Sequence, residues 1–242
     1  MRVVLVAAFL ASTVVARPIR IAATGDSYTW GRKCNGDPYT NSYPVRMQQI
    51  LKEEYGYETN VSNAGLFNVA FEYALNPAIK QYAVRYCEEG QGYCGKSGDL
   101  HYPDMIKEVS ADADVMLIMM GTNDVELKTE ETFDWTRWHD IYSQWLDYVR
   151  TFFSGPIMLI VPPRSFAGFG HITGSRRFHA FLHSVAVQYD VAFAEGVTEG
   201  IESRDNSCDG IHYKPEFNKN IAENVARKLV ESGILKGVLA RA

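Results

Sequence analysis

The sequence predicts an α/β fold in which helices cover both faces of a parallel sheet. Short apolar runs rich in β-branched residues alternate along the chain with longer segments of helical periodicity. Strand and helix repeated in this way form parallel sheets. The run at 114–120 is almost continuously apolar, as in strands buried on both faces. An apolar content of 46%, with no repeat or linker, predicts one domain.

The first half of the chain supplies three strands and one helix. Residues 18–23 contain an apolar run with β-branched side chains, which favours a strand. In residues 43–55, Met47, Ile50 and Leu51 recur at helical spacing and predict an amphipathic helix. Shorter runs predict further strands at 57–61 and 114–120.

The second half continues the alternation. Helical periodicity and short apolar runs follow one another up to the last long helix. The expected helices are 134–153, 175–189 and 215–232, and the expected strands are 156–161 and 191–194. Together with the first half, these segments make a sheet of five strands.

The first 16 residues predict a secretory signal peptide. Arg2 precedes an apolar segment at 3–15, and small residues follow at a typical cleavage position. That segment is shorter than the roughly 20 residues that span a bilayer, which favours a signal peptide over a membrane anchor. The alternative to a signal peptide is that the segment forms a buried first strand. We therefore expect a secreted mature domain at 17–242 without a stable membrane anchor. Asn60 begins a glycosylation sequon whose occupancy the sequence leaves open.

The four cysteines predict two disulfides, because disulfides form and persist in exported chains. Cys87 and Cys94 are close neighbours in a glycine-rich stretch and are expected to pair, which leaves Cys34 for Cys208. Their spacing differs from that of a tetrahedral zinc site.

Charge and histidine spacing disfavour two kinds of partner. The formal net charge is −5, whereas a protein that binds phosphate backbones needs a positive surface. His179 and His183 lie four residues apart on an expected helix, but no third ligand follows at a telling distance. We therefore expect neither a nucleic-acid partner nor a metal. The sequence makes no prediction of oligomeric state.

Ser27 is the candidate nucleophile. The sequence Gly25-Asp26-Ser27 leaves the first strand at its carboxyl end, where open α/β sheets place their chemistry. A serine hydroxyl needs a base, and the base needs an orienting acid. Asp209 and His212, three residues apart before the last helix, can share one tight loop in which Asp209 holds the ring and His212 takes the serine proton.

Donors for an oxyanion are expected after two other strands. Gly65 follows the second expected strand, and Asn123 follows the third within Gly121-Thr122-Asn123-Asp124. A glycine lets a backbone N–H approach a reacting carbonyl closely, and an asparagine amide can donate to the same oxygen.

Taken together, these motifs resemble those of the SGNH hydrolases, the GDSL esterase and lipase superfamily. They stand in family order across nearly the whole mature chain, centred on Ser27, Gly65, Asn123 and the pair Asp209 and His212. The resemblance implies a flavodoxin-like three-layer α/β/α sandwich with five parallel strands. It also implies a Ser27, His212 and Asp209 triad, an oxyanion hole made by the Ser27 and Gly65 N–H groups with the Asn123 amide, and no cofactor.

Segments beside the motifs bear on the substrate. The interval 66–101 is an insertion near the expected site, and whether it acts as a lid is open. Candidate substrate contacts are Tyr28 and Trp30 beside the nucleophile, and Phe166 and Phe169 in a glycine-containing loop.

Aromatic faces beside hydrogen-bonding groups suit a sugar, and 41–44 resembles carbohydrate-esterase members of the superfamily. We therefore expect a secreted serine esterase for short acyl esters, acetyl above all, on a small molecule or glycan. It would work through an acyl-enzyme. The alternatives are a lipase or lysophospholipase for longer acyl chains and a catalytically silent glycan-binding module.

Overall fold

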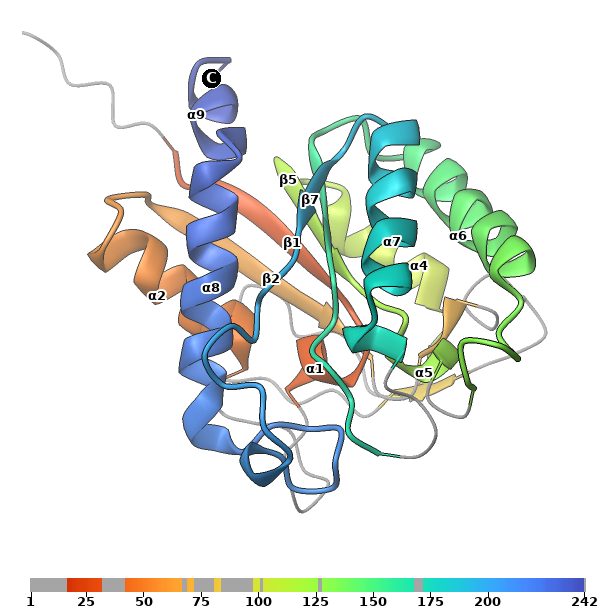
Figure 1. Ribbon diagram of the computed structural model, residues 1–242. Helices are drawn as coiled ribbons and strands as arrows, with labels where there is room; N and C mark the ends of the chain where they lie inside the picture. The colour runs from red at the N-terminus through yellow and green to blue at the C-terminus, as the bar shows by residue number, and fades with distance from the viewer. Residues whose placement is uncertain are drawn as a thin grey trace, which may run out of the picture.

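A five-stranded parallel sheet forms the centre of the protein (Figure 1). The computed structural model describes residues 17–31, 42–66, 69–71, 81–83, 98–100, 102–125, 128–167 and 172–241. The strands, in spatial order, are β2 (Thr59–Gly65), β1 (Ile19–Gly25), β5 (Val115–Met119), β6 (Ile157–Ile160) and β7 (Ala192–Ala194). Every neighbouring pair in this sheet is parallel, as predicted.

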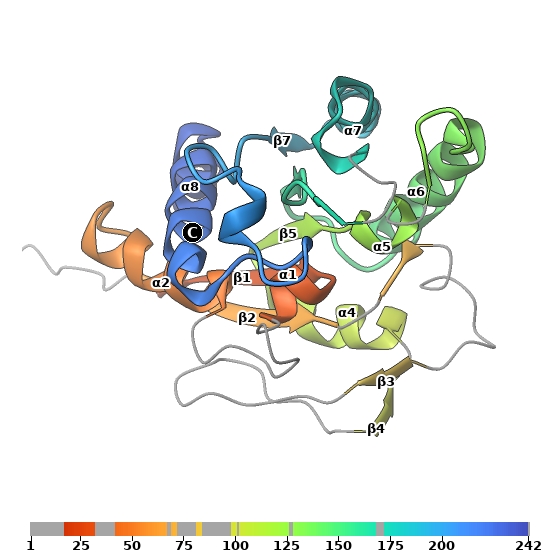
Figure 2. The same cartoon turned by 60° about the horizontal axis from the view of Figure 1, so that its bottom comes forward.

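Helices cover both faces of the sheet and complete three layers (Figure 2). One face packs against α2 (Tyr43–Glu53) and α8 (Asn218–Glu231), which α9 (Ile234–Leu239) follows. The other face packs against α4 (Tyr102–Ser110), α6 (Trp135–Arg150) and α7 (Arg176–Gln188). Two short helices, α1 (Ser27–Trp30) and α5 (Thr122–Val125), follow β1 and β5. The predicted three-layer α/β/α architecture is confirmed.

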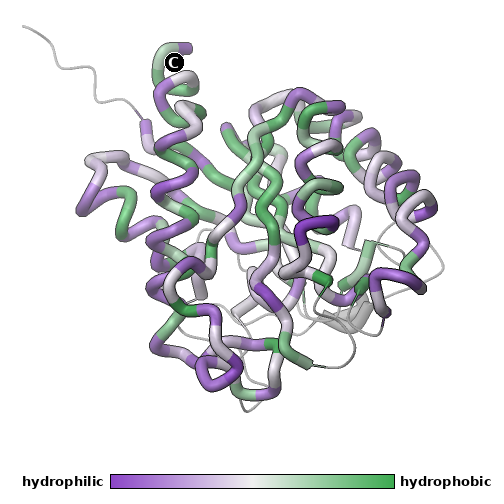
Figure 3. Tube along the Cα trace, viewed as in Figure 1, coloured by the Kyte–Doolittle hydropathy of each residue, from purple (hydrophilic) through white to green (hydrophobic). Residues whose placement is uncertain are grey.

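Strand β5 shows why the sheet needs both helical layers. Met116 and Ile118 belong to the apolar cluster under α4, α6 and α7, whereas Val115, Leu117 and Met119 belong to the cluster under α2 and α8. Side chains alternate between the two faces of a strand, so a fully apolar strand is stable only between two covered faces. Hydrophobic residues accordingly follow the central strands in Figure 3.

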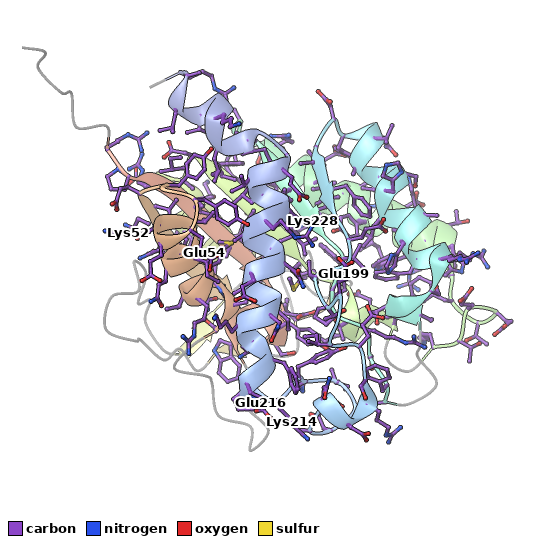
Figure 4. All side chains as sticks on the ribbon, turned by 60° about the vertical axis from the view of Figure 1, so that its left-hand side comes forward. Lys52, Glu54, Glu199, Lys214, Glu216 and Lys228 are labelled. Carbon is purple, nitrogen blue, oxygen red and sulfur yellow. The ribbon has the colours of Figure 1, made fainter. Side chains whose placement is uncertain are left out.

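The outer surfaces of the helical layers are charged. Figure 4 shows Lys52 on α2, Glu54 just beyond it and Lys228 on α8, with Lys214 and Glu216 before the start of α8. Charged residues on the outer face and apolar residues on the inner face are typical of helices that pack on a sheet. None of the described helices is long and apolar enough to cross a bilayer.

The predicted boundary of the second strand was wrong. β2 begins at Thr59 and runs through Gly65 instead of ending at Val61, so Asn63 and Gly65 lie in the strand and not in the turn after it. Parallel pairing of Gly25 with Gly65 extends the ladder to this point. Backbone pairing with β1 therefore outweighs the turn preference of asparagine and glycine.

The interval 66–101 contains a small structure that the pattern did not predict. β3 (Gln81–Ala83) pairs antiparallel with β4 (Gly98–Leu100). Helix α4 follows, also unpredicted, with Met105, Ile106 and Val109 on its buried face. Tyr102, Met105, Ile106 and Val109 do follow the helical spacing i, i+3, i+4 and i+7, but the helix has only nine residues, which makes so short a period easy to overlook.

Candidate active site

Ser27 lies where β1 ends and the short helix α1 begins. Asp26 is the N-cap of this helix, and its Oδ1 accepts a hydrogen bond from the Tyr28 N–H at 3.0 Å. A capping carboxylate satisfies a backbone donor that has no partner within the helix. Ser27 is 3% exposed, so the hydroxyl is held in a defined, nearly buried turn.

Two glycines allow this turn to sit against the sheet. A Cβ atom on Gly65 would lie 2.0 Å from the Trp30 backbone nitrogen. A Cβ atom on Gly25 would lie 2.2 Å from Thr29 Oγ1 and 2.3 Å from the Met119 carbonyl oxygen. No side chain fits at such distances. Both glycines are therefore needed to seat α1 on β1 and β2.

The structure brings Ser27, His212 and Asp209 together in one hydrogen-bonded chain. His212 Nε2 lies 2.8 Å from Ser27 Oγ, and His212 Nδ1 lies 2.8 Å from Asp209 Oδ2. The His212 residue is 4% exposed. A base within hydrogen-bond reach of a hydroxyl, oriented in turn by a carboxylate, is the arrangement that activates a serine nucleophile.

Asp209 holds the histidine through its backbone as well as its ring. Asp209 Oδ1 accepts hydrogen bonds from the Ile211 N–H at 2.9 Å and the His212 N–H at 2.8 Å. Burial alone raises the pKa of Asp209, but the hydrogen bonds from the His212 ring and from these two N–H groups outweigh it and lower the pKa. The carboxylate is therefore ionised, as is needed to orient and stabilise an imidazolium.

The pKa of the second carboxyl of the site, Asp26, is shifted in the opposite direction from that of Asp209. It is fully buried behind Ser27. Burial raises the pKa of Asp26 to about 7, while the hydrogen bond from the Tyr28 N–H opposes this shift. Near neutral pH Asp209 is therefore ionised, whereas Asp26 is only partly ionised.

Two predicted oxyanion donors already have acceptors. Asn123, in α5, donates from Nδ2 to the Val69 carbonyl oxygen at 2.7 Å. Because the amide carries two hydrogens, this bond fixes the side chain and leaves the second N–H for an oxyanion. The Gly65 N–H donates to Asn63 Oδ1 at 2.9 Å. The donor roles of Ser27, Gly65 and Asn123 remain predictions.

The family is decided by a match over most of this chain. Residues 21–225 match the family model described as GDSL-like Lipase/Acylhydrolase. The chain belongs to this family. The predicted family is therefore confirmed, and this acylhydrolase is a carboxylic ester hydrolase. No curated protein matches its sequence.

Solved structures of esterases share the fold of this acylhydrolase. Est24, a carbohydrate acetylesterase from Sinorhizobium meliloti, aligns with a TM-score of 0.61 at 16% identity, over 88% of this chain and 99% of Est24. A family 3 carbohydrate esterase from Clostridium thermocellum aligns with a TM-score of 0.61 at 15% identity, over 92% and 99%. An inhibitor-bound aryl esterase from M. smegmatis aligns with a TM-score of 0.61 at 18% identity, over 88% of this chain and 99% of the aryl esterase. Identities this low show the fold alone.

The predicted substrate contacts of the acylhydrolase lie in different surroundings. Tyr28 is 9% exposed and its ring centroid lies 5.6 Å from that of His212. Trp30 is partly buried in α1. Phe166 is partly buried between Tyr213, at 6.5 Å between centroids, and the Arg164 guanidinium, 5.4 Å from its ring centre. Phe169 lies outside the described residues.

Cys208 immediately precedes the triad acid and is disulfide-bonded. Cys34, Cys87 and Cys94 lie outside the described residues, as does the signal segment 1–16. The Cys34 to Cys208 and Cys87 to Cys94 pairings therefore stay predictions.

The two histidines of α7 have contacts other than a metal. His179 Nδ1 lies 3.0 Å from Glu195 Oε2 and its Nε2 lies 3.1 Å from the Thr173 carbonyl oxygen, while the His183 ring packs beside Phe193. Among the described residues, no three His, Cys, Asp or Glu side chains are grouped to hold a metal ion.

Sequence spacing missed the support of the loop that carries Asp209 and His212. The Phe166 N–H donates to the Gly210 carbonyl oxygen, and Arg204 Nη1 donates to the Phe166 carbonyl oxygen at 3.1 Å. The segment after β6 thus holds the triad loop through backbone atoms. Any residue supplies a backbone carbonyl, so no residue type marks these contacts in a sequence.

Proposed function

We propose that this acylhydrolase is a secreted serine esterase that removes short acyl groups, acetyl above all, from carbohydrate. The hydrogen-bonded chain from Asp209 through His212 to Ser27, with 2.8 Å at each step, carries the proposal. It supplies an oriented base to a hydroxyl at the carboxyl end of the sheet, where such folds bind their ligands.

The reaction follows from this geometry. Ser27 Oγ attacks the ester carbonyl carbon while His212 Nε2 takes the hydroxyl proton. The developing oxyanion accepts hydrogen bonds from the Ser27 N–H and from the second N–H of Asn123. The Gly65 N–H has one hydrogen, so it joins these donors by exchanging its bond to Asn63 Oδ1 for one to the oxyanion. His212 then gives its proton to the leaving alcohol oxygen, and the acyl group remains on Ser27. Water, deprotonated by His212, then attacks the acyl carbon of this acyl-enzyme. The bond from that carbon to Ser27 Oγ breaks, His212 returns the proton to Ser27 Oγ, and the carboxylic acid is released.

Two observations support a hydrophilic substrate. A hollow of about 460 Å³ on the loop that carries the triad acid is lined by polar side chains, including Arg204, Ser207, Asp209 and Lys214, while Ser27 and His212 lie outside this lining. Two structures with this fold are named as a carbohydrate acetylesterase and a carbohydrate esterase. Phe166, whose N–H bonds the Gly210 carbonyl oxygen of the same loop, adds an aromatic group nearby, and hydrogen-bonding groups near an aromatic suit a sugar better than a long acyl chain.

Secretion is supported by the sequence of the first 16 residues, which has the charge, apolar core and small residues of an export signal. The disulfide at Cys208 agrees with an oxidising compartment. N-terminal sequencing of the protein recovered from the medium of a secreting host checks this part, with Arg17 as the expected first residue.

Acyl-chain preference tests the substrate. The kcat/KM for p-nitrophenyl esters from acetate to palmitate is measured beside acetate release from acetylated xylan and other acetylated glycans. The proposal predicts a maximum at acetate or propionate and release of acetate from at least one glycan. A rate that climbs beyond octanoate, without acetate from any glycan, would favour the lipase or lysophospholipase alternative.

The catalytically silent glycan-binding module lacks support. Membership of an acylhydrolase family and a complete hydrogen-bonded triad both favour catalysis, because sugar binding requires no such triad.

A further inference from the structure

We propose that the Tyr28 hydroxyl is a positioning group for the base of the triad. The hydroxyl donates a hydrogen bond to the carbonyl oxygen of Ile211, the residue before His212. The two residues are 183 positions apart in the sequence. This inference rests on the proposed function, because it assigns Tyr28 a role in the Ser27 and His212 chemistry.

Tyr28 belongs to a series of hydrogen bonds that joins both carboxyls of the site. Its backbone N–H donates to Asp26 at 3.0 Å, and its hydroxyl donates to the Ile211 carbonyl. The Ile211 N–H donates to Asp209 at 2.9 Å, and Asp209 bonds the ring of His212. Tyr28, next to the nucleophile, therefore adds a direct link to the turn with the acid and base, which the Phe166 N–H and the Cys208 N–H hold from its other sides.

The bond from the Tyr28 hydroxyl to the Ile211 carbonyl matters because Ser27 and His212 are held in place by different means. Ser27 is fixed by a helix that is seated on the sheet, whereas Ile211 and His212 lie in a loop without helix or strand. Loops are more mobile than the elements they connect. The Tyr28 ring also lies 5.6 Å from the His212 ring, tilted by 41°, so ring and hydroxyl constrain the same turn.

The burial of Tyr28 argues against the substrate contact expected from the sequence. The residue is 9% exposed, and its single hydroxyl proton is donated to a backbone carbonyl. A substrate group would have to displace this bond in order to accept from the hydroxyl. Tyr28 therefore acts through His212.

The test is Tyr28→Phe, which keeps the ring and removes the hydroxyl. Rates are expressed per active site titrated with a fluorophosphonate, so that misfolded protein does not count. We expect kcat for p-nitrophenyl acetate to fall by about 10-fold to 100-fold, with KM within about twofold, since small displacements of a reacting group carry costs of this size. The rate constant of fluorophosphonate labelling should fall in parallel, because it depends on Ser27 activation and not on acyl binding.

The matched control is Tyr189→Phe. The Tyr189 hydroxyl also donates to a backbone carbonyl, that of Ser143 at 3.0 Å, between α7 and α6. This variant should lose a similar amount of thermal stability and keep its kcat. Equal kcat for Tyr28→Phe and the wild type would overturn the inference, and a raised KM with unchanged labelling would show a substrate contact instead. Loss of the proposed function is a separate result, seen as hydrolysis that persists in Ser27→Ala.

Discussion

The nucleophile turn, Asp26–Trp30, and the loop with Asp209 and His212 meet at one hydrogen bond but are built differently. Asp26 is fully buried, and glycines without room for a Cβ seat its turn on the sheet. Asp209 has a side chain that is 39% exposed, in a loop held by bonds to backbone atoms. Packing therefore determines the position of Ser27, and polar contacts determine the position of His212.

This difference separates two kinds of variant. Changes that disturb packing under the nucleophile turn should lower the free energy of unfolding, because interiors tolerate little added volume. Changes in the loop should lower the reaction rate while the fold persists, because few buried apolar contacts depend on them. Each prediction below places one variant on one side of this division.

The largest effect on kcat is expected from changes to Ser27 and His212, whose hydrogen bond joins the two regions. Ser27→Ala and His212→Ala should each lower kcat for acetyl ester hydrolysis by about 10⁴-fold to 10⁶-fold, since members of a triad act as a unit. Circular dichroism should show a native fold. His183→Ala, an α7 histidine beside Phe193, is the control and should keep its activity. Hydrolysis at the wild-type rate by folded Ser27→Ala would contradict the mechanism.

On the packed side, the charge of Asp26 should link stability to pH. Its pKa is raised by burial to about 7 in the folded protein, against about 3.9 in the unfolded chain. The folded state therefore holds the proton more tightly, so this contribution to stability is complete below about pH 4 and is lost as pH rises toward 7. The loss is on the order of 4 kcal/mol.

Urea denaturation of wild type and Asp26→Asn at pH 4.5 and 7.5 measures this loss. The variant cannot ionise, so its advantage over the wild type should grow with pH. The pKa of Asp209 is lowered in the folded protein, so its effect on stability depends on pH in the opposite direction. Its contribution to the free energy of unfolding is present at neutral pH and is lost only as pH falls through the folded pKa. Parallel stability profiles for the two proteins would rule out a raised pKa at Asp26.

Removing the predicted oxyanion donor Asn123 should lower the reaction rate more than it lowers the stability of the fold. Asn123→Ala should lower kcat by roughly 100-fold to 1000-fold, the usual effect of losing one such donor. Asn224→Ala removes a comparable amide bond, to the Val197 carbonyl oxygen at 3.1 Å, and should leave kcat unchanged. A kcat for Asn123→Ala within threefold of that of Asn224→Ala would remove Asn123 from the oxyanion hole.

Adding one methyl group at position 65 should test how closely α1 packs on β2. Gly65→Ala places a Cβ against the Trp30 backbone and should lower the free energy of unfolding by about 2 to 3 kcal/mol. Gly237→Ala in α9 meets no atom within 4 Å and should raise it by about 0.5 to 1 kcal/mol. Chemical denaturation measures both changes. Equal stabilities would mean that the turn can move away from β2.

Sequence patterns predicted the large elements well and the contacts of the site unevenly. The run 114–120 predicted β5 because a strand buried on both faces needs an unbroken apolar sequence. The glycine at position 65 was assigned to a donor role, whereas its neighbours show a steric reason for glycine. The bond from Tyr28 to Ile211 joins residues that are distant in sequence, and its acceptor is a backbone atom that every residue possesses.

Fluorophosphonate labelling followed by peptide mass spectrometry tests most directly whether Ser27 is the nucleophile that His212 activates. The purified protein is treated with the probe at neutral pH, and the modified peptide is sequenced. The geometry predicts one adduct, on Ser27, that forms as ester hydrolysis is lost and is absent from His212→Ala. An adduct on another serine, or full hydrolytic activity after complete modification of Ser27, would contradict this assignment.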